Sequence, residues 1–368
     1  MSDTTVRWVD LRLRDDAAAV EAAIRRVIEA GWFVLGPEGE AFETEFAEAT
    51  NGGQTVGVAS GTDALTLTLR ALGIGTGDEV ITTALSAVYS AQAIVMAGAH
   101  PVFADIDPSR LTLDPAAVEA LVGPKTAAIM PVHLYGQPAD LPALATVADR
   151  HGLAIIEDCC QAHLATCREA PVGTVGVAAA YSFYPTKNLG ALGDGGAITT
   201  RDSQLEMRLR RLRNGGQTTR NRHTEPSAHS RLDEIQAAIL RARLRLLPSW
   251  TARRRAIAAQ YRDGLANASV LVPANLDTGH VYHLFPIRTA GRDAFQEHLR
   301  DRKIETLVHY PVPIPAQPAF AFANPAPCPI TATVCSELVS LPLYPRLRDA
   351  EVVQVIEAVN TAPETGTL

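Results

Sequence analysis

Short apolar runs alternate with amphipathic stretches of helical period between residues 55 and 200, and this alternation leaves few folds open to the chain. Apolar runs that are each followed by a helix are typical of parallel strands joined by crossover helices. The predicted helices are 62–72, 88–97, 114–122 and 140–151, and the predicted strands are Thr55–Ala59, Glu79–Thr83, His100–Asp105, Thr126–His133, Leu153–Glu157, Ala178–Phe183 and Gly196–Thr200. We therefore expect an α/β sheet with helices on its faces.

The chain beyond residue 200 shows a different pattern and predicts a second, smaller domain. A helix at 203–213 is followed by a polar loop at 214–229 and then by a helical region at 231–267, which breaks near Pro248. Because a single core stops growing at about 250–300 residues, a chain of 368 residues is expected to divide. We place a large domain at 1–248 and a small α+β domain at 249–368.

The composition excludes several classes of function. A formal net charge of −7 without a basic stripe argues against nucleic acid or an anionic membrane as the main partner. The longest apolar stretch, 84–99, is too short to span a bilayer and predicts a buried helix. No export signal precedes Trp8, so we expect a cytoplasmic protein. The five cysteines lack the spacing of disulfide or zinc frameworks, so we expect reduced thiols and no metal.

Lysine is rare in this chain. Lysine and arginine together number 33, yet only Lys125, Lys187 and Lys303 are lysines. A lysine in an apolar site can lose its proton and act as a nucleophile, whereas arginine stays charged. Lys187 follows an apolar strand at its carboxyl end, where open α/β sheets bind ligands. The alternative is a loop lysine that binds a neighbouring carbonyl.

Asp158 follows another apolar strand and is expected at the same edge of the sheet. A buried carboxylate needs a cation or strong donors, although Asp158 alone would also serve as a helix N-cap. Together, Asp158 and Lys187 suggest pyridoxal phosphate. Its aldehyde takes a lysine, and a carboxylate keeps its ring nitrogen protonated.

The turn Ser60-Gly61-Thr62-Asp63 follows the first strand and opens a helix, which suits a phosphate. Ordinary capping by Ser60 also explains this turn. No Walker lysine or G-x-G-x-x-G accompanies it, which disfavours nucleotide hydrolysis and dinucleotide binding. Ser182 would place a hydroxyl on the same phosphate, or would simply be a serine at the sheet edge.

A basic run lies in and after the helix at 203–213. A solvated helix face explains most of it, but for Arg220 and Arg222 we keep the hypothesis of a clamp for a diphosphate on the substrate. The run consists of Arg208, Arg210, Arg211, Arg213, Arg220 and Arg222.

A series of short motifs follows along nearly the whole chain. They include Ser60-Gly-Thr62-Asp-Ala-Leu, Pro131-Val-His-Leu-Tyr-Gly-Gln137, Glu157-Asp158-Cys-Cys-Gln161-Ala-His163, Ser182-Phe-Tyr-Pro-Thr-Lys187-Asn-Leu-Gly190, Ser230-Arg-Leu-Asp and His309-Tyr310-Pro311. In this order they resemble the DegT/DnrJ/StrS-type sugar aminotransferases, which are pyridoxal-phosphate enzymes. The resemblance implies fold type I of the pyridoxal-phosphate-dependent transferases. That fold has a large domain with a mostly parallel central sheet flanked by helices, and a small α+β C-terminal domain.

The resemblance also implies a role for each matching residue. Lys187 would form the Schiff base with the cofactor, Asp158 would pair with the ring nitrogen, and Gln161 would approach the ring hydroxyl. Family members are homodimers with active sites at the subunit interface, and the segment before Ser-Arg-Leu-Asp reaches the partner's cofactor. The phosphate would be held by Gly61, Thr62 and Ser182, with His229 contributing across the interface, and the candidate substrate-binding residues are Tyr89, Arg220, Arg222, His309 and Tyr310.

Four positions depart from the family's usual pattern. His229 replaces an asparagine, and Ala87 stands where many members stack an aromatic residue on the pyridine ring. Pro315 replaces a histidine and Leu164 replaces a glycine. The first departure affects the contact to the partner's cofactor, the second affects ring stacking, and the last two affect the acceptor pocket.

The sequence therefore predicts transfer of an amino group from an amino acid, glutamate by resemblance, to a nucleotide-linked keto-deoxysugar in antibiotic or surface-glycan synthesis. One alternative is an aminocyclitol-forming aminotransferase. A second is a sugar dehydratase on the same scaffold, which Lys187 disfavours because such enzymes carry histidine there. The third is a non-catalytic regulatory module.

Overall fold

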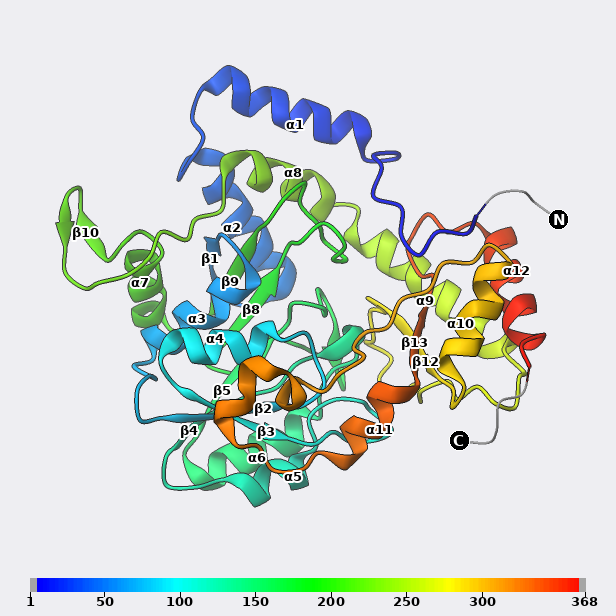
Figure 1. Ribbon diagram of the computed structural model, residues 1–368. Helices are drawn as coiled ribbons and strands as arrows, with labels where there is room; N and C mark the ends of the chain where they lie inside the picture. The colour runs from blue at the N-terminus through cyan, green and yellow to red at the C-terminus, as the bar shows by residue number, and fades with distance from the viewer. Residues whose placement is uncertain (1–4, 364–368) are drawn as a thin grey trace.

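The computed structural model describes residues 5–363 and contains a seven-stranded central sheet (Figure 1). Its order is β1-β9-β8-β5-β4-β2-β3, and only β9 runs antiparallel to its neighbours. The strands are β1 (Gln54–Val58), β2 (Glu79–Thr83), β3 (His100–Ala104), β4 (Thr126–Met130), β5 (Ala154–Asp158), β8 (Ala178–Ser182) and β9 (Gly196–Thr200). Each overlaps a predicted strand, so the expectation of a mostly parallel α/β sheet is confirmed.

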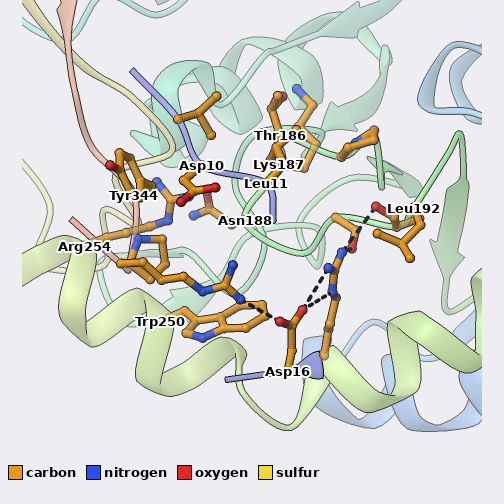
Figure 2. A pocket seen from close by; sticks show the side chains of 17 residues that line it. Asp10, Leu11, Asp16, Thr186, Lys187, Asn188, Leu192, Trp250, Arg254 and Tyr344 are labelled. Atoms are coloured by element: carbon orange, nitrogen blue, oxygen red, sulfur yellow. Dashed lines mark hydrogen bonds and ion pairs between the residues drawn. The ribbon is translucent and has the colours of Figure 1, made fainter. Parts of the chain in front are cut away.

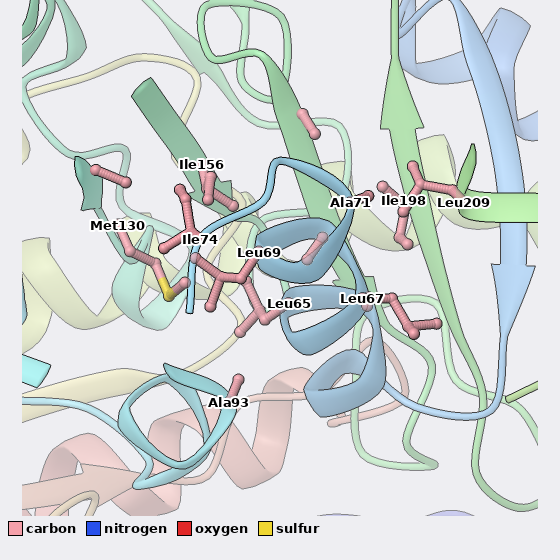
Figure 3. Close-up of a cluster of buried hydrophobic side chains, with 14 of the residues drawn as sticks. Leu65, Leu67, Leu69, Ala71, Ile74, Ala93, Met130, Ile156, Ile198 and Leu209 are labelled. Atoms are coloured by element: carbon pink, nitrogen blue, oxygen red, sulfur yellow. The ribbon is translucent and has the colours of Figure 1, made fainter. Parts of the chain in front are cut away.

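Helices cover both faces of this sheet. Alternate residues of β8 point to opposite sides: Ala178 and Ala180 join the apolar cluster around α3, whereas Ala179 and Tyr181 pack with Phe42 of α2. Figure 3 shows the first of these clusters. The helices are α1 (Ala17–Ala30), α2 (Pro37–Thr50), α3 (Gly61–Ala71), α4 (Tyr89–Ala97), α5 (Pro115–Leu121), α6 (Leu141–His151), α7 (Ser203–Leu212) and α8 (Glu234–Leu244).

The C-terminal part has its own apolar core, in which Tyr261 of α9 packs with Phe285 of β12 and Val352 of α12. Its antiparallel pair β12–β13 is the only strand pairing there among the named strands of residues 5–363. Its elements are α9 (Leu247–Gly264), β12 (Phe285–Arg288), α10 (Arg292–Asp301), the 3-10 turns η2 (Ile314–Ala316) and η3 (Pro318–Ala323), α11 (Pro329–Glu337), β13 (Leu338–Leu341) and α12 (Asp349–Asn360).

The division at 248/249 stays a prediction. Helix α9 begins at Leu247, close to the predicted break, but the chain crosses that boundary in both directions. Val6 packs in the C-terminal core, and Phe320 packs against Phe103 of β3.

Two local expectations need correction. The segment 214–229 is not simply a polar loop, because it contains a hairpin that projects from the body of the molecule (Figure 1). The stretch 84–99 is not a fully buried helix, since α4 covers only its middle and exposes Val95 and Met96. The remaining short elements are η1 (Leu134–Gly136), β6 (Thr166–Cys167), β7 (Ala170–Pro171), β10 (Gln217–Thr219) and β11 (Arg222–His223).

Within residues 5–363, none of the helices is both long enough and apolar enough to cross a bilayer. The five cysteines are all free thiols, as their spacing predicted.

Candidate active site

The candidate site lies where β1, β5 and β8 end at one edge of the sheet. Because these three strands run in the same direction, the residues that follow them meet there. A Cβ atom added to Gly61 would lie 2.7 Å from the Sγ of Cys160 and 2.8 Å from the Cβ of Ser182. The structure therefore brings together the turn after β1, the turn after β5 and the last residue of β8.

The N-terminus of α3 forms the first wall of this site. Ser60 caps the helix, because its Oγ accepts from the N–H of Asp63 at 3.1 Å. The hydroxyl of Ser230, which is distant in sequence, stabilises the turn. It accepts a hydrogen bond from the backbone N–H of Ala59 and donates one to the carboxylate of Asp63. Gly61 leaves no space for a side chain, so its backbone lies directly against Ser182. Capping by Ser60 is thus present, and the N-terminus of α3 at Gly61 and Thr62 still offers the backbone N–H groups and the helix dipole that suit a phosphate.

Asp158 ends β5 and is almost fully buried. It does not cap a helix, since turns follow it; instead, its Oδ1 accepts from the N–H of Cys160 at 3.0 Å. Burial raises the pKa of Asp158, and the hydrogen bonds from Cys160 partly offset this. No ion pair to this carboxylate occurs within residues 5–363. A cation placed beside it would bind strongly, because the carboxylate is already out of water.

Lys187 lies in the turn that follows β8, where its backbone N–H donates to the carbonyl of Tyr184 at 2.8 Å. Burial lowers the pKa of Lys187, while the nearby Cys160 and Asp158 act in the opposite direction. A lysine in this environment has a larger neutral fraction near physiological pH than a solvated lysine, which suits a nucleophile and a proton carrier.

Gln161 connects the site to the C-terminal part of the chain. Its Oε1 accepts from the N–H of Tyr135 at 2.8 Å, and its Nε2 donates to the hydroxyl of Tyr310 at 3.1 Å. Tyr135 is buried and has a left-handed backbone (φ 59°), and its own hydroxyl donates to the carbonyl of His309. His309 in turn contacts the Oγ of Ser340 at 3.0 Å. The structure thus places Gln161, His309 and Tyr310 in one connected group.

Sequence reasoning missed several polar residues around Lys187. Asn188 donates to the carbonyl of Val281 and contacts the Nδ1 of His283 at 3.3 Å. Burial, and after it the charge of Lys187, holds the pKa of His283 well below its usual range. The buried Arg254 donates to the carbonyls of Tyr282, His283 and Leu343. The contacts of Asn188 join residues 93 and 95 positions apart, and those of Arg254 span 28, 29 and 89 positions, so no local pattern in the sequence predicts them.

A cavity lies beside the segment that carries Lys187, and Figure 2 shows the side chains that line it. Arg243 and Arg346 both bind the carboxylate of Asp16, at 2.8 and 2.7 Å. Arg254 also lines the cavity but pairs with no carboxylate in the described part of the chain. Burial alone lowers its pKa to about 9. Backbone carbonyls, rather than an acid, stabilise this guanidinium.

Four predicted residues lie apart from this group or at its edge. Tyr89 begins α4 and is 61% exposed, although it lies close enough to Tyr310 for its charge to affect the pKa of that phenol. Arg220, Arg222 and His229 lie on or next to the projecting hairpin and are exposed. The chain does not bring these three residues to its own Lys187 through any contact within residues 5–363.

The remaining basic run is anchored rather than solvated, which corrects the expectation for it. Arg213 is buried and pairs with Glu43, and Arg210 pairs with Glu43 at 2.7 Å. Arg208 binds Glu225 at 3.1 Å. These pairs fasten α7 and the base of the hairpin to α2.

One group of side chains within residues 5–363 has the spacing of a metal site: His133, Glu157 and Cys159. The Nδ1 of His133 accepts from the N–H of Ala139, so its Nε2 carries the proton and donates to Glu157 at 3.1 Å. Burial raises the pKa of Glu157, but its hydrogen-bond donors outweigh this and the net shift is downward. The other donors are the backbone N–H groups of Gly173, Val175 and Gly176. A satisfied histidine–glutamate pair accounts for this group.

Comparison with known proteins identifies the family. Residues 14–360 match the model of the DegT/DnrJ/EryC1/StrS aminotransferase family. The chain belongs to this family. The earlier resemblance is therefore confirmed, together with its implications of fold type I, transaminase activity and pyridoxal phosphate as cofactor.

Individual relatives cover nearly the whole chain. A dTDP-3-amino-3,4,6-trideoxy-alpha-D-glucose transaminase of Streptomyces venezuelae is 47% identical over 93% of this chain and 91% of its own. The erythromycin biosynthesis sensory transduction protein EryC1 of Saccharopolyspora erythraea is 46% identical over 92% of each chain. The crystal structure of DesV from S. venezuelae, in complex with a ketimine intermediate, matches with a TM-score of 0.94 and 46% identity over 97% of this chain and 98% of that one.

The geometry of the site fits pyridoxal phosphate. The N-terminus of α3 places the backbone N–H groups at Gly61 and Thr62 beside Ser182, because Gly61 packs too closely for a side chain, and a phosphate suits such a helix N-terminus. Asp158 offers a buried carboxylate for a protonated ring nitrogen, and Lys187 offers an amine with a lowered pKa. Gln161, which is expected on the hydroxyl side of the ring, is held in place by its hydrogen bonds with Tyr135 and Tyr310.

Proposed function

We propose that this aminotransferase moves an amino group from glutamate to a nucleotide-linked keto-deoxysugar, and that it acts in the cytoplasm. The observation that carries the proposal is the meeting of Lys187, Asp158 and the Gly61 turn at one edge of the sheet. The sugar-transaminase name of the Streptomyces venezuelae relative supports the acceptor class.

In this proposal, Lys187 and Asp158 divide the proton chemistry between them. The cofactor, when bound, supplies a carbonyl that takes an amine and a protonated ring that accepts electrons. Asp158 keeps a proton on the ring nitrogen through its buried carboxylate. Lys187 takes a proton from the substrate carbon at its Nζ and returns it at a neighbouring atom, which its lowered pKa favours.

The other residues bind and orient. Thr62, Ser182 and the backbone of Gly61 hold the phosphate, and Gln161 fixes the ring on its hydroxyl side. His309 and Tyr310 close the site from the C-terminal part of the chain. Because Gln161 is itself held by the N–H of Tyr135, the ring would be oriented by groups that cannot rotate freely.

We also propose a homodimer in which Arg220, Arg222 and His229 act at the partner's site. These residues lie on or beside a hairpin that projects from the body of the molecule. Exposed apolar side chains flank the start of α8. Trp32 and Phe33 are 57% and 50% exposed, and the carbonyl of Phe33 accepts from the N–H of Glu234. An apolar surface of this kind suits contact with a second copy of the chain.

The deciding experiment is a two-stage assay with purified protein and pyridoxal phosphate. Incubation with glutamate should release 2-oxoglutarate in an amount equal to the active sites. A panel of nucleotide-linked keto-deoxysugars and cyclitol ketones then identifies the acceptor. Lys187→Ala should abolish both stages, whereas Lys125→Ala, a change in an exposed turn, should abolish neither.

Each alternative function predicts a different result in this assay. Preference for a cyclitol ketone would favour the aminocyclitol enzyme, and loss of water without gain of nitrogen would favour the dehydratase. Absence of any reaction with glutamate would favour a non-catalytic regulatory module; the Saccharopolyspora erythraea relative is named a sensory transduction protein.

A further inference from the structure

The first turn of α3 carries an acidic side chain at the same helix N-terminus where the phosphate is expected to bind. Ser60 is the N-cap, and the backbone N–H of Asp63, at the third helical position, donates to the Oγ of Ser60 at 3.1 Å. The N–H groups of Gly61 and Thr62 have no hydrogen-bond partner among residues 5–363, so they remain for the phosphate. The helix dipole attracts the Asp63 carboxylate as well, and this carboxylate repels a phosphate.

The Asp63 carboxylate has a distant partner instead of a local one. An acidic side chain three residues after a serine N-cap often turns back to accept from the N–H of the cap residue. No such bond joins Asp63 to the N–H of Ser60 in the part of the chain that the structure describes. The Oδ2 of Asp63 accepts instead from the hydroxyl of Ser230 at 2.8 Å, across 167 positions of sequence.

The proton of the Ser230 hydroxyl has a fixed direction. Its Oγ accepts from the backbone N–H of Ala59 at 3.0 Å, and because an N–H can only donate, the hydroxyl proton is left for Asp63. Ser230 is only 2% exposed, and its own backbone N–H donates to the carbonyl of Arg213 at 2.9 Å. A buried hydroxyl that is held in this way gives the carboxylate one defined position.

The turn has other supports besides the Asp63 carboxylate. Its cap comes from Ser60, and the Oγ of Ser230 already binds the N–H of Ala59. Asp63 is partly exposed, so water can solvate its carboxylate without a protein donor. The distinct effect of the bond between Ser230 and Asp63 is therefore to hold a negative charge in place, where it leaves the N–H groups at the start of α3 free.

We propose that Ser230 is a positioning residue that restrains the Asp63 carboxylate and so keeps the N-terminus of α3 free for the phosphate of the cofactor. Without the hydroxyl, the carboxylate can turn toward the N–H groups of Gly61 and Thr62 and compete with the phosphate as a second anion. The inference rests on the phosphate position in the proposed function, and it adds a residue that does not itself touch the phosphate.

The test measures the dissociation constant of pyridoxal phosphate for the apoenzyme by protein fluorescence. Ser230→Ala should raise this constant about tenfold, the size expected when a hydrogen bond to a charged group is lost. Asp63→Ala should bind the cofactor at least as tightly as the wild type, because the competing charge is gone. For the same reason, the double variant should recover to within about threefold of Asp63→Ala. Pyridoxal, which lacks the phosphate, should show less than a threefold change in each variant.

Ser269→Ala is the matched control, because Ser269 is a buried serine in the C-terminal part of the chain whose hydroxyl donates to Asn267 at 2.7 Å. It should leave the binding of pyridoxal phosphate unchanged.

Three results would overturn the inference. The first is a Ser230→Ala protein that binds pyridoxal phosphate within twofold of the wild type, and the second is a double variant that keeps the full tenfold loss. The third is an Asp63→Ala protein that binds more than threefold more weakly than the wild type, since the bond would then support the turn rather than restrain a charge. This last variant decides the question even where Ser230→Ala does not fold. A wild-type protein that binds pyridoxal as tightly as pyridoxal phosphate would instead overturn the phosphate position in the proposed function.

Discussion

Replacing Gly61 with alanine should push apart the residues between which the cofactor's phosphate is expected to bind. The new Cβ would lie 2.7 Å from the Sγ of Cys160 and 2.8 Å from the Cβ of Ser182. Favourable contacts between such atoms lie near 3.5–4.0 Å, so both neighbours must move by roughly 1 Å. Cys160 precedes Gln161 and its N–H binds Asp158, so the displacement would also reach the residues that orient the ring.

The expected size of the effect follows from the cost of overpacking, which is about 1–3 kcal/mol. In the apoenzyme the displaced side chains can relax toward the position expected for the phosphate, so we expect the cost to fall mainly on cofactor binding. The dissociation constant of pyridoxal phosphate should rise by about 5- to 150-fold. Titration of the apoenzyme, followed by absorbance and protein fluorescence, measures this constant.

Two controls separate a lost phosphate seat from general damage. Gly123→Ala should be silent, since an added Cβ there meets no atom within 4 Å. The Gly61→Ala change should weaken the binding of pyridoxal, which lacks the phosphate, much less than it weakens the binding of pyridoxal phosphate. A Gly61→Ala protein that binds pyridoxal phosphate within twofold of wild type would refute the assignment of the phosphate to this turn.

Three further predictions concern charge. Asp158→Asn should leave a folded protein whose turnover is at least about 100-fold lower, because the electrostatic support of the ring is lost; near-normal turnover would remove Asp158 from the mechanism. The double change Arg220→Ala and Arg222→Ala should raise KM for the nucleotide sugar about tenfold and leave KM for glutamate unchanged, as expected for lost charge-assisted bonds; equal KM values before and after would make these arginines ordinary surface residues. Burial lowers the pKa of His163 to about 3. Since the unfolded chain takes up this proton near pH 6.5 and the folded chain does not, the free energy of unfolding should fall by about 2 kcal/mol between pH 7.5 and pH 5 on account of His163 alone. Urea unfolding at the two pH values should show that His163→Phe removes this part of the pH dependence, and an unchanged dependence would contradict the calculation.

Local patterns were enough to predict the sheet and the residues at its edge. The strand Glu79–Thr83 and the strand Gly196–Thr200 were predicted with the bounds that the structure has. The apolar runs and their turn residues are local signals, and parallel strands bring their carboxyl ends together by topology. For this reason Lys187, Asp158 and the Gly61 turn could be grouped before any coordinates were known.

The remainder of the site depends on contacts between distant parts of the chain. Tyr135 holds Gln161 from one side, while Tyr310 holds it from 149 positions away. Arg254 and His283 reach the neighbourhood of Lys187 through the C-terminal core. Such pairings are fixed by tertiary packing, which leaves no periodic signal in the sequence. The expectation of a solvated face for Arg210 failed for the same reason, because its partner Glu43 lies on another helix.

The most direct test of the central claim is to find which amine carries the cofactor. The chain has three lysines, so borohydride reduction of the cofactor-loaded protein, followed by digestion and mass spectrometry, can give only a few answers. The account predicts a pyridoxyl group on Lys187 in nearly every chain and none on Lys125 or Lys303. A label on either of those residues, or no stable label after reduction, would contradict it.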